Sequence, residues 1–247
     1  MSIELAGQFP LSAKPFALRE PSGPPALIVR DLVCGYGNRP LLGPISFTVD
    51  RGCFLLIEGP NGAGKSTLVK TLIGLLAAVS GGYSWGVERE HLRFVPQTRT
   101  LDPMLPATVH DVLATGLHRG RGWRALRIRD DGAQIERALA LVEMGEFSRK
   151  LFRELSEGQK QLVLLARALL GEPAIVLLDE PSASMDPERE AQTIALLQKL
   201  RHEHAMTVLM IAHGSPLARE ASDRIMTLDR DGQVHIGATS CASCETH

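Results

Sequence analysis

The sequence predicts an α/β fold in which a mostly parallel sheet is covered by helices on both faces. Two observations lead to this fold class. Segments with strand character alternate with segments of helical period along most of the chain, an order typical of parallel sheets. A helical stretch from about 98 to 164 interrupts this alternation, so we expect it to form a separate lobe.

The expected elements follow one another in a regular order. In the first part of the chain we expect strands over 26–33, 45–49, 54–58 and 92–96 and a helix over 64–79. In the second part we expect helices over 108–117, 134–143, 156–170 and 187–202 and strands over 174–179 and 206–212. Two last strands, 225–228 and 233–236, flank Asp231-Gly232, a pair typical of a hairpin turn.

Length and composition limit the domain organisation. The chain has 247 residues, 44% of them hydrophobic, which is enough for one large domain or two small ones. Residues 1–25 are rich in proline and show no clear period, so we expect a mobile arm there. We expect 26–237 to form the ordered domain and 238–247 to form a tail.

Charge and hydropathy exclude several classes of protein. The formal net charge of −1 gives no electrostatic footprint for nucleic acid, so no nucleic acid is expected as a partner. The longest apolar runs, such as 174–178, are far shorter than the roughly 20 residues of a membrane-spanning helix. Residues 1–10 show no secretory signal pattern. We therefore expect a cytosolic protein in which Cys34 and Cys53 are reduced thiols.

A glycine-rich segment between a predicted strand and a predicted helix fits the Gly-x4-Gly-Lys-Ser pattern of a phosphate-binding loop. The segment is Gly59-Pro60-Asn61-Gly62-Ala63-Gly64-Lys65-Ser66, with Thr67 directly after it. Glycines let backbone N–H groups close around phosphates, and the N-terminus of the following helix adds the positive end of a dipole. Lys65 would neutralise the β- and γ-phosphates, and the Ser66 hydroxyl would bind Mg²⁺. The loop alone does not separate kinases, GTPases and transport ATPases.

An apolar strand over 175–178 ends in two carboxylates, Asp179 and Glu180. At the carboxyl end of a parallel strand, side chains face the crevice in which ligands bind. We expect Asp179 to bind Mg²⁺, often through water, and Glu180 to orient or deprotonate the attacking water as a general base. A solvated turn after a strand is the alternative interpretation of this pair taken alone.

Further residues stand in a definite order around the phosphate loop and the acidic pair. Tyr36 precedes the phosphate loop, Gln97 follows Phe94-Val95-Pro96, and Leu155-Ser156-Glu157-Gly158-Gln159 lies at the start of the predicted 156–170 helix. Ser182 to Asp186 follows the acidic pair, and His213 ends a predicted strand. Each residue alone has a structural explanation; Ser156, for example, is also a good helix N-cap. In their joint order over roughly 26–237 these residues resemble the ATP-binding subunit of an ABC transporter, and 155–159 is similar to that family's Leu-Ser-Gly-Gly-Gln motif.

The resemblance implies a P-loop NTPase fold: a RecA-like, mostly parallel sheet with an antiparallel β subdomain and an inserted helical subdomain. It also implies ATP and Mg²⁺ as ligands. Tyr36 would stack on adenine, and His213 would sense the γ-phosphate. The implied catalytic residues are Glu180, His213 and Gln97, and the implied magnesium ligands are Ser66, Gln97 and Asp179.

The resemblance further implies a homodimer of two copies packed head to tail. ATP on the phosphate loop of one copy would be closed over by Ser156, Gly158 and Gln159 of the other, at the N-terminus of the predicted 156–170 helix. Two positions depart from the family pattern: Glu157 stands where the family has glycine, and Leu162 where it often has arginine. Because an anion facing a phosphate would be costly, we expect the Glu157 side chain to point outward.

A transport function implies partners and a location. The implied partners are an integral membrane permease subunit, docked on the lobe between Gln97 and Leu155, and an external substrate-binding protein. The implied location is peripheral, on the cytoplasmic face of the inner (plasma) membrane. The basic segment 118–130 either lies near anionic headgroups or the membrane subunit, or is a solvated face.

The cargo is less well defined by the sequence. Segments 108–113 and 164–169 resemble those of importers for metal ions and metal chelates (zinc, manganese, iron chelates). In the tail, Cys241, Cys244 and His247 have the spacing of metal ligands, with His235 nearby; a disordered tail is the alternative. A soluble assembly scaffold and the ATPase subunit of an exporter are the alternative functions.

Overall fold

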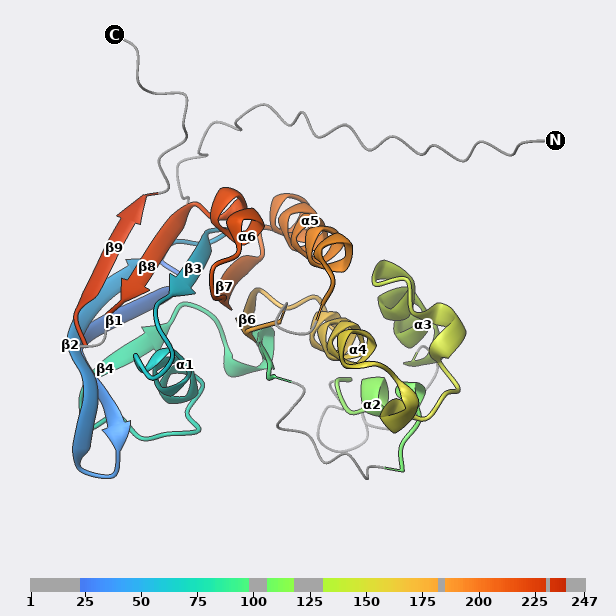
Figure 1. Ribbon diagram of the computed structural model, residues 1–247, viewed down its shortest axis with the longest axis horizontal. Helices are drawn as coiled ribbons and strands as arrows, with labels where there is room; N and C mark the ends of the chain where they lie inside the picture. The colour runs from blue at the N-terminus through green and yellow to red at the C-terminus, as the bar shows by residue number, and fades with distance from the viewer. Residues whose placement is uncertain (1–22, 98–105, 118–130, 182–184, 230–231, 239–247) are drawn as a thin grey trace, which may run out of the picture.

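The computed structural model describes residues 23–97, 106–117, 131–181, 185–229 and 232–238, and its main element is a six-stranded sheet (Figure 1). The strands lie in the order β5-β6-β7-β3-β8-β9. Their bounds are β3 (Phe54–Glu58), β5 (Leu92–Val95), β6 (Ile175–Asp179), β7 (Thr207–Ile211), β8 (Arg224–Leu228) and β9 (Val234–Ala238). From β5 to β8 the neighbours pair in parallel, and β9 joins antiparallel to β8. The predicted mostly parallel sheet is confirmed.

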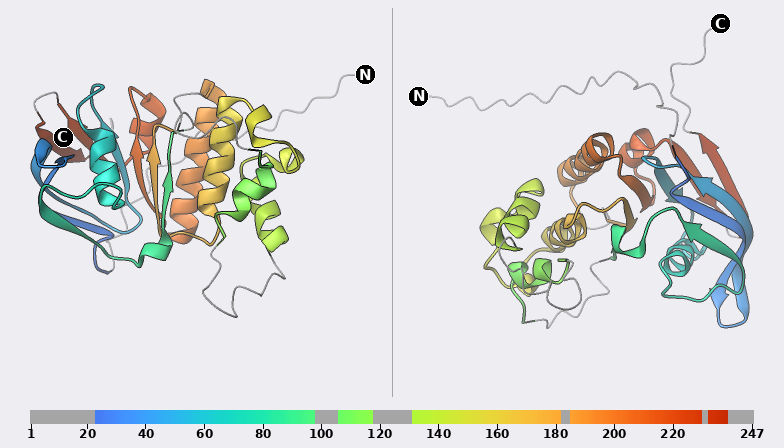
Figure 2. Two further views of the ribbon diagram at one scale, coloured as in Figure 1. Left: turned by 90° about the horizontal axis from the view of Figure 1, so that it is seen from below. Right: turned by 180° about the vertical axis from the view of Figure 1, so that it is seen from behind.

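A second sheet, of three antiparallel strands in the order β2-β1-β4, lies beside the first. Its strands are β1 (Leu27–Tyr36), β2 (Arg39–Val49) and β4 (Ser80–Trp85). Helix α1 (Lys65–Leu72) lies between the two sheets, as Figure 2 shows. Its buried Leu68 and Leu72 belong to one apolar cluster with Leu27 of β1 and Ile57 of β3. This sheet corresponds to the expected antiparallel β subdomain.

The large sheet is covered by helices on its other face as well. Because successive side chains of a strand point to opposite faces, Leu55 and Ile57 of β3 face α1 while Phe54 and Leu56 join the second cluster. That cluster contains residues of α4 (Glu157–Leu169), α5 (Pro187–His204) and α6 (Pro216–Ala221). Burial on both faces explains why the central strands read as continuous apolar runs in the sequence.

Three helices pack together at one side of the sheet: α2 (Val109–Ala114), α3 (Asp131–Leu141) and α4 (Figure 1). Leu113, Ile135 and Leu139 are buried in their common core. The limits of about 98–164 for this lobe stay a prediction, because 98–105 and 118–130 lie outside the described residues. The arm over 1–25 and the tail over 238–247 stay predictions too, because the structure describes only 23–25 and 238 of these ranges.

The structure differs from the expected elements in several places, among them β2, which begins at Arg39 where the expected strand begins at 45. The helix predicted over 64–79 ends at Leu72, since Gly74 takes a φ of +78° and Leu75 is 65% exposed. Strand β4 follows at Ser80–Trp85, where no element was expected. The short α6 was not expected either. Within the described part of the chain, no helix is long and apolar enough to cross a bilayer.

Candidate functional site

The predicted phosphate loop connects β3 with α1, the context that its pattern requires. Three of its glycines have positive φ values: +148° at Gly59, +86° at Gly62 and +93° at Gly64. Gly59 lies so close to the neighbouring strand that an added Cβ would be 2.2 Å from the carbonyl oxygen of Leu228. The loop therefore needs glycine for its backbone shape and, at Gly59, for space as well.

Lys65, the first residue of α1, folds back over the loop that precedes it. Its Nζ donates hydrogen bonds to the carbonyl oxygens of Gly59 at 2.8 Å and Pro60 at 3.0 Å, and the residue is buried. Phosphate oxygens carry full charge and would bind this ammonium group more strongly than neutral carbonyls do. The loop and its lysine are thus arranged as an anion site.

A hydroxyl and a carboxylate meet beside the loop. Ser66 Oγ donates a hydrogen bond to Asp179 Oδ1 at 3.2 Å, which joins α1 to the end of β6. Burial raises the pKa of Asp179 above its ordinary value, and the hydrogen bond from Ser66 opposes this shift. Hydroxyl and carboxylate oxygens are ligands that suit Mg²⁺, and a cation would offset the cost of burying the carboxylate. The two residues fit a magnesium site.

Gln97 and Glu180 contact each other across the ends of two adjacent parallel strands, β5 and β6. Gln97 Nε2 donates a hydrogen bond to Glu180 Oε2. The backbone of Glu180 has a φ of +49°, which is uncommon for a residue other than glycine, and its N–H donates to the carbonyl of Ile211. Backbone strain of this kind clusters at functional sites. The structure therefore holds the Glu180 carboxylate in a fixed place, beside Asp179.

Tyr36 and His213 follow strands of the two different sheets. Tyr36 ends β1, is 57% exposed, and has its hydroxyl 3.4 Å from Thr67 Oγ1. His213 is exposed and follows β7, which lies between β6 and β3 in the sheet. Since parallel strands end at a common edge, the sheet places His213 between the acidic pair and the loop.

The residues of the expected dimer motif open α4. Ser156 Oγ accepts a hydrogen bond from the Gln159 N–H at 3.3 Å, and Gln159 Oε1 accepts one from the Ser156 N–H at 3.0 Å. This reciprocal pair is a capping box. Gly158 is buried in the first turn. The Glu157 side chain is 48% exposed and forms an ion pair with Lys160 at 2.7 Å, so in the single chain it lies at the surface.

Two polar connections were missed by sequence reasoning. Gln161 is buried on α4, and its Nε2 donates to the carbonyl of Pro96 at 3.4 Å, which ties α4 to the segment that carries Gln97. A glutamine on the apolar face of the predicted helix was the available signal. Glu58, at the end of β3, pairs with Arg219 of α6. These residues are 161 positions apart, so no local pattern predicts their contact.

Several predicted residues lie outside the described part of the chain. They are residues 182–184 of the expected dimer-contact loop, which include Ser182, the basic segment 118–130, and Cys241, Cys244 and His247 of the tail. Among the described residues, no group of three or more histidine, cysteine or acidic side chains is placed to hold a metal ion. Metal binding by the tail therefore stays a prediction.

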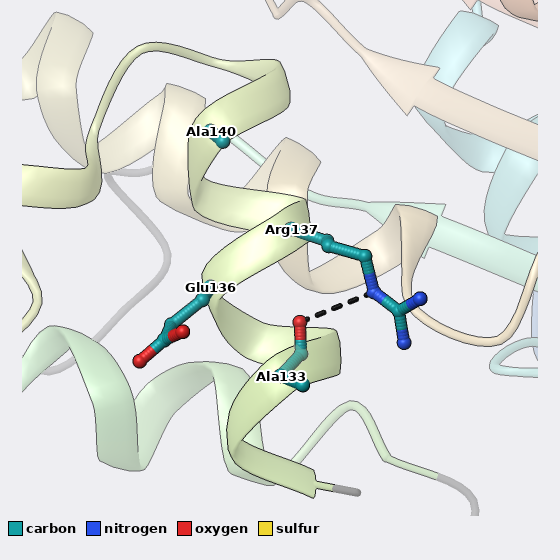
Figure 3. A pocket seen from close by; sticks show the side chains of 4 residues that line it. All are labelled: Ala133, Glu136, Arg137 and Ala140. Carbon is teal, nitrogen blue, oxygen red and sulfur yellow. Dashed lines mark hydrogen bonds between the residues drawn. The ribbon is translucent and has the colours of Figure 1, made fainter.

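A shallow, open depression lies on the helical lobe. It is lined by Ala133, Glu136, Arg137 and Ala140, which recur along one side of α3 (Figure 3). Arg137 Nε donates to the carbonyl of Ala133 at 3.2 Å, one turn earlier on the same helix. None of the predicted site residues lines this depression, and we assign it no ligand.

The chain is similar to one group of known proteins. The family model of the ABC transporter matches residues 42–183. A zinc transport system ATP-binding protein of Treponema pallidum is 35% identical over 209 residues, which are 83% of this chain and 78% of the relative. A manganese transport system ATP-binding protein of Bacillus subtilis is 34% identical over 203 residues, 80% of this chain and 81% of the relative. A dimeric ATP-binding cassette, solved in a post-hydrolysis state with ADP and Pi, has a TM-score of 0.75 and 26% identity and covers 86% of this chain and 98% of its own.

Proposed function

This chain belongs to the ABC transporter family, and from that premise we propose that it powers the import of a metal ion, zinc or manganese, through a separate membrane subunit. The chain is an ATP-hydrolysing enzyme. The proposal rests mainly on one observation. The Ser66–Asp179 contact and the Gln97–Glu180 contact lie side by side next to the phosphate loop. The names of the two relatives support the class of cargo.

In this proposal the loop from Gly59 to Thr67 binds the phosphates of ATP through its backbone N–H groups. Lys65 exchanges its two loop carbonyls for phosphate oxygens. The exposed ring of Tyr36 stacks on the adenine. Ser66 and Asp179, with Gln97, would hold Mg²⁺, which neutralises negative charge on the phosphates when bound.

Hydrolysis then depends on Glu180, which accepts a proton from the attacking water as a general base. Its hydrogen bond from Gln97 supports this role, because the amide orients the carboxylate. His213 follows a strand of the same sheet and would donate a hydrogen bond to the γ-phosphate, stabilising charge that develops there.

A second copy of the chain completes the site. The solved dimer of a similar cassette supports a homodimer. The N-terminus of α4 offers backbone N–H groups and the positive end of a helix dipole, which bind anions. In the proposed dimer, Ser156, Gly158 and Gln159 of the second copy close over the nucleotide.

The remaining partners follow from the importer role. We propose that residues 26–237 form the ATP-binding domain and that an integral membrane permease docks on the helical lobe. The chain would lie peripherally on the cytoplasmic face of the plasma membrane, and an external binding protein would deliver the cargo.

Glu180→Gln tests the catalytic part of the proposal. The variant keeps the size of the side chain but loses the base, so ATP should still bind while turnover falls by at least about 100-fold. A closed dimer should accumulate with ATP in gel filtration. Glu203→Gln, an exposed position on α5, is the matched control and should behave as wild type. Turnover within about threefold of wild type would contradict the role of Glu180.

Cellular metal content tests the cargo. Deletion of the gene should lower the zinc or manganese content of cells grown in metal-poor medium, measured by mass spectrometry. Wild-type protein should restore it, and the Glu180→Gln variant should not. Normal contents of both metals in the deletion strain would exclude metal import as the function.

A further inference from the structure

The residue directly before the phosphate loop is a buried carboxylate. The Glu58 side chain is 5% exposed, and Arg219 Nε donates to its Oε1 at 3.0 Å while a second guanidinium nitrogen contacts Oε2. The Arg219 side chain is 55% exposed. A buried charge without a partner is strongly destabilising. Loss of Arg219 would leave the Glu58 carboxylate buried without a charged partner. Loss of Glu58 would cost much less, because the Arg219 guanidinium stays hydrated.

This ion pair attaches α6 to β3 at the loop end of the strand. At the other end of β3, Asp223 Oδ2 accepts a hydrogen bond from the Phe54 N–H at 2.8 Å. Since Asp223 lies two residues after the last residue of α6, both ends of β3 are connected to this helix and its flank. A helix of six residues has little stability of its own, so its position is set by such contacts.

Helix α6 begins shortly after His213. Gly214 follows with a φ of +66°, and Ser215 caps the helix by accepting a hydrogen bond from the Ala218 N–H at 3.0 Å. This short connection is fixed by β7 at one end and by α6 at the other. A displacement of α6 would therefore move His213 relative to the phosphate loop.

We propose that Glu58 and Arg219 are a positioning pair that couples the phosphate loop to His213. On one side, Glu58 precedes Gly59, whose carbonyl holds Lys65. On the other side, Arg219 holds α6, whose first residues carry the connection to His213. The pair acts on the reaction through these residues and does not itself contact the nucleotide. The inference rests on the role proposed above for His213.

Hydrogen exchange of the full nucleotide-free chain tests the coupling without relying on turnover. Arg219→Met leaves the Glu58 carboxylate buried and unpaired, so amides in both 59–64 and 214–222 should exchange at least about tenfold faster. The double variant Glu58→Met/Arg219→Met replaces both partners by apolar side chains, leaves no buried polar group unpaired and should recover most of the protection. Faster exchange confined to 214–222 would overturn the proposal, because the pair would then hold α6 alone.

Two more variants complete this measurement. Glu220→Gln changes an exposed side chain of the same helix and should leave both segments at wild-type rates. Arg219→Lys keeps the charge but not the two-nitrogen contact, so both segments should show a smaller increase than with Arg219→Met. If Arg219→Met does not fold, the same comparison between the two segments is made with Arg219→Lys.

Steady-state ATPase kinetics separates positioning from nucleotide binding. Arg219→Met should lower kcat about tenfold and leave the KM for ATP within about twofold. In a His213→Ala background it should cause no further loss of kcat. A raised KM with unchanged kcat, or losses that add in the double variant, would overturn the proposal. A normal kcat of the His213→Ala variant would contradict the role proposed for His213. A lowered kcat of His213→Ala together with a normal kcat of Arg219→Met would contradict only the positioning pair.

Discussion

Alanine at two glycines of the phosphate loop should have unequal effects on stability, although both residues have positive φ values. At Gly62 the φ is +86°, and no heavy atom lies within 4 Å of an added Cβ. At Gly59 the φ is +148°, and the Cβ would lie 2.2 Å from the Leu228 carbonyl oxygen and 3.2 Å from its carbon. The obstacle is backbone of β8, which pairs with β3 along its length and cannot yield without disturbing the sheet.

The size of each effect follows from these surroundings. For Gly62→Ala the cost is backbone strain alone, about 1 kcal/mol. For Gly59→Ala the clash with β8 adds to the strain and brings the total to about 3 kcal/mol or more. In a chain of this size, each kcal/mol lowers Tm by about 2–4 °C. We expect Tm to fall by about 2–4 °C for Gly62→Ala and by about 6–12 °C for Gly59→Ala.

Thermal unfolding followed by circular dichroism measures the difference. The nucleotide is left out, because a ligand that binds only the folded state adds stability of its own. Equal losses of Tm in the two variants would refute the reasoning, since φ strain alone would then set the cost. A smaller loss at Gly59 than at Gly62 would show that the contact with Leu228 is relieved cheaply.

Lys65→Ala removes the ammonium group that the loop carbonyls hold, and ATP affinity by calorimetry should fall by at least about 100-fold; unchanged affinity would exclude the phosphate contact. Glu157→Gly removes a surface carboxylate paired with Lys160, so the KM for ATP should change less than about tenfold, and a larger change would place this carboxylate at the nucleotide. Asp179→Asn should raise the Tm of the nucleotide-free chain, because burial raises the pKa of this carboxyl and makes its ionised form costly. The cost of the ionised carboxylate is present above the folded-state pKa and vanishes below the ordinary pKa of 3.8. The gain in Tm should therefore shrink as the pH falls to about 4. A gain that does not change with pH would rule out the buried charge as its cause.

The sequence predicted those parts of the fold that local patterns determine. Strands β3, β6 and β7 are buried on both faces, so each appears as an unbroken apolar run. The phosphate loop was recognised because its glycines and lysine stand at fixed spacings. Asp179 and Glu180 were placed correctly at the end of β6, since a strand pattern also fixes where the strand ends.

Other parts depend on contacts between distant segments. Leucines at 68, 72 and 75 keep a helical spacing, but Gly74 turns the chain and leaves Leu75 exposed. Strand β4 contains Gly81 and Gly82 and little apolar surface, so its strand conformation depends on pairing with β1. The Glu58–Arg219 pair is of the same kind, because either residue alone is an ordinary charged position.

The capping box of Ser156 and Gln159 has a consequence for assembly. The first turn of α4 is closed by its own side chains, so this helix is fully formed in a single copy. A hydroxyl that accepts one hydrogen bond can still donate another, and Ser156 could therefore bind a phosphate oxygen without opening the cap. Two copies that meet would lose little conformational entropy at this surface. In the proposed dimer, the capped first turn could therefore meet the terminal phosphate without prior rearrangement of this surface.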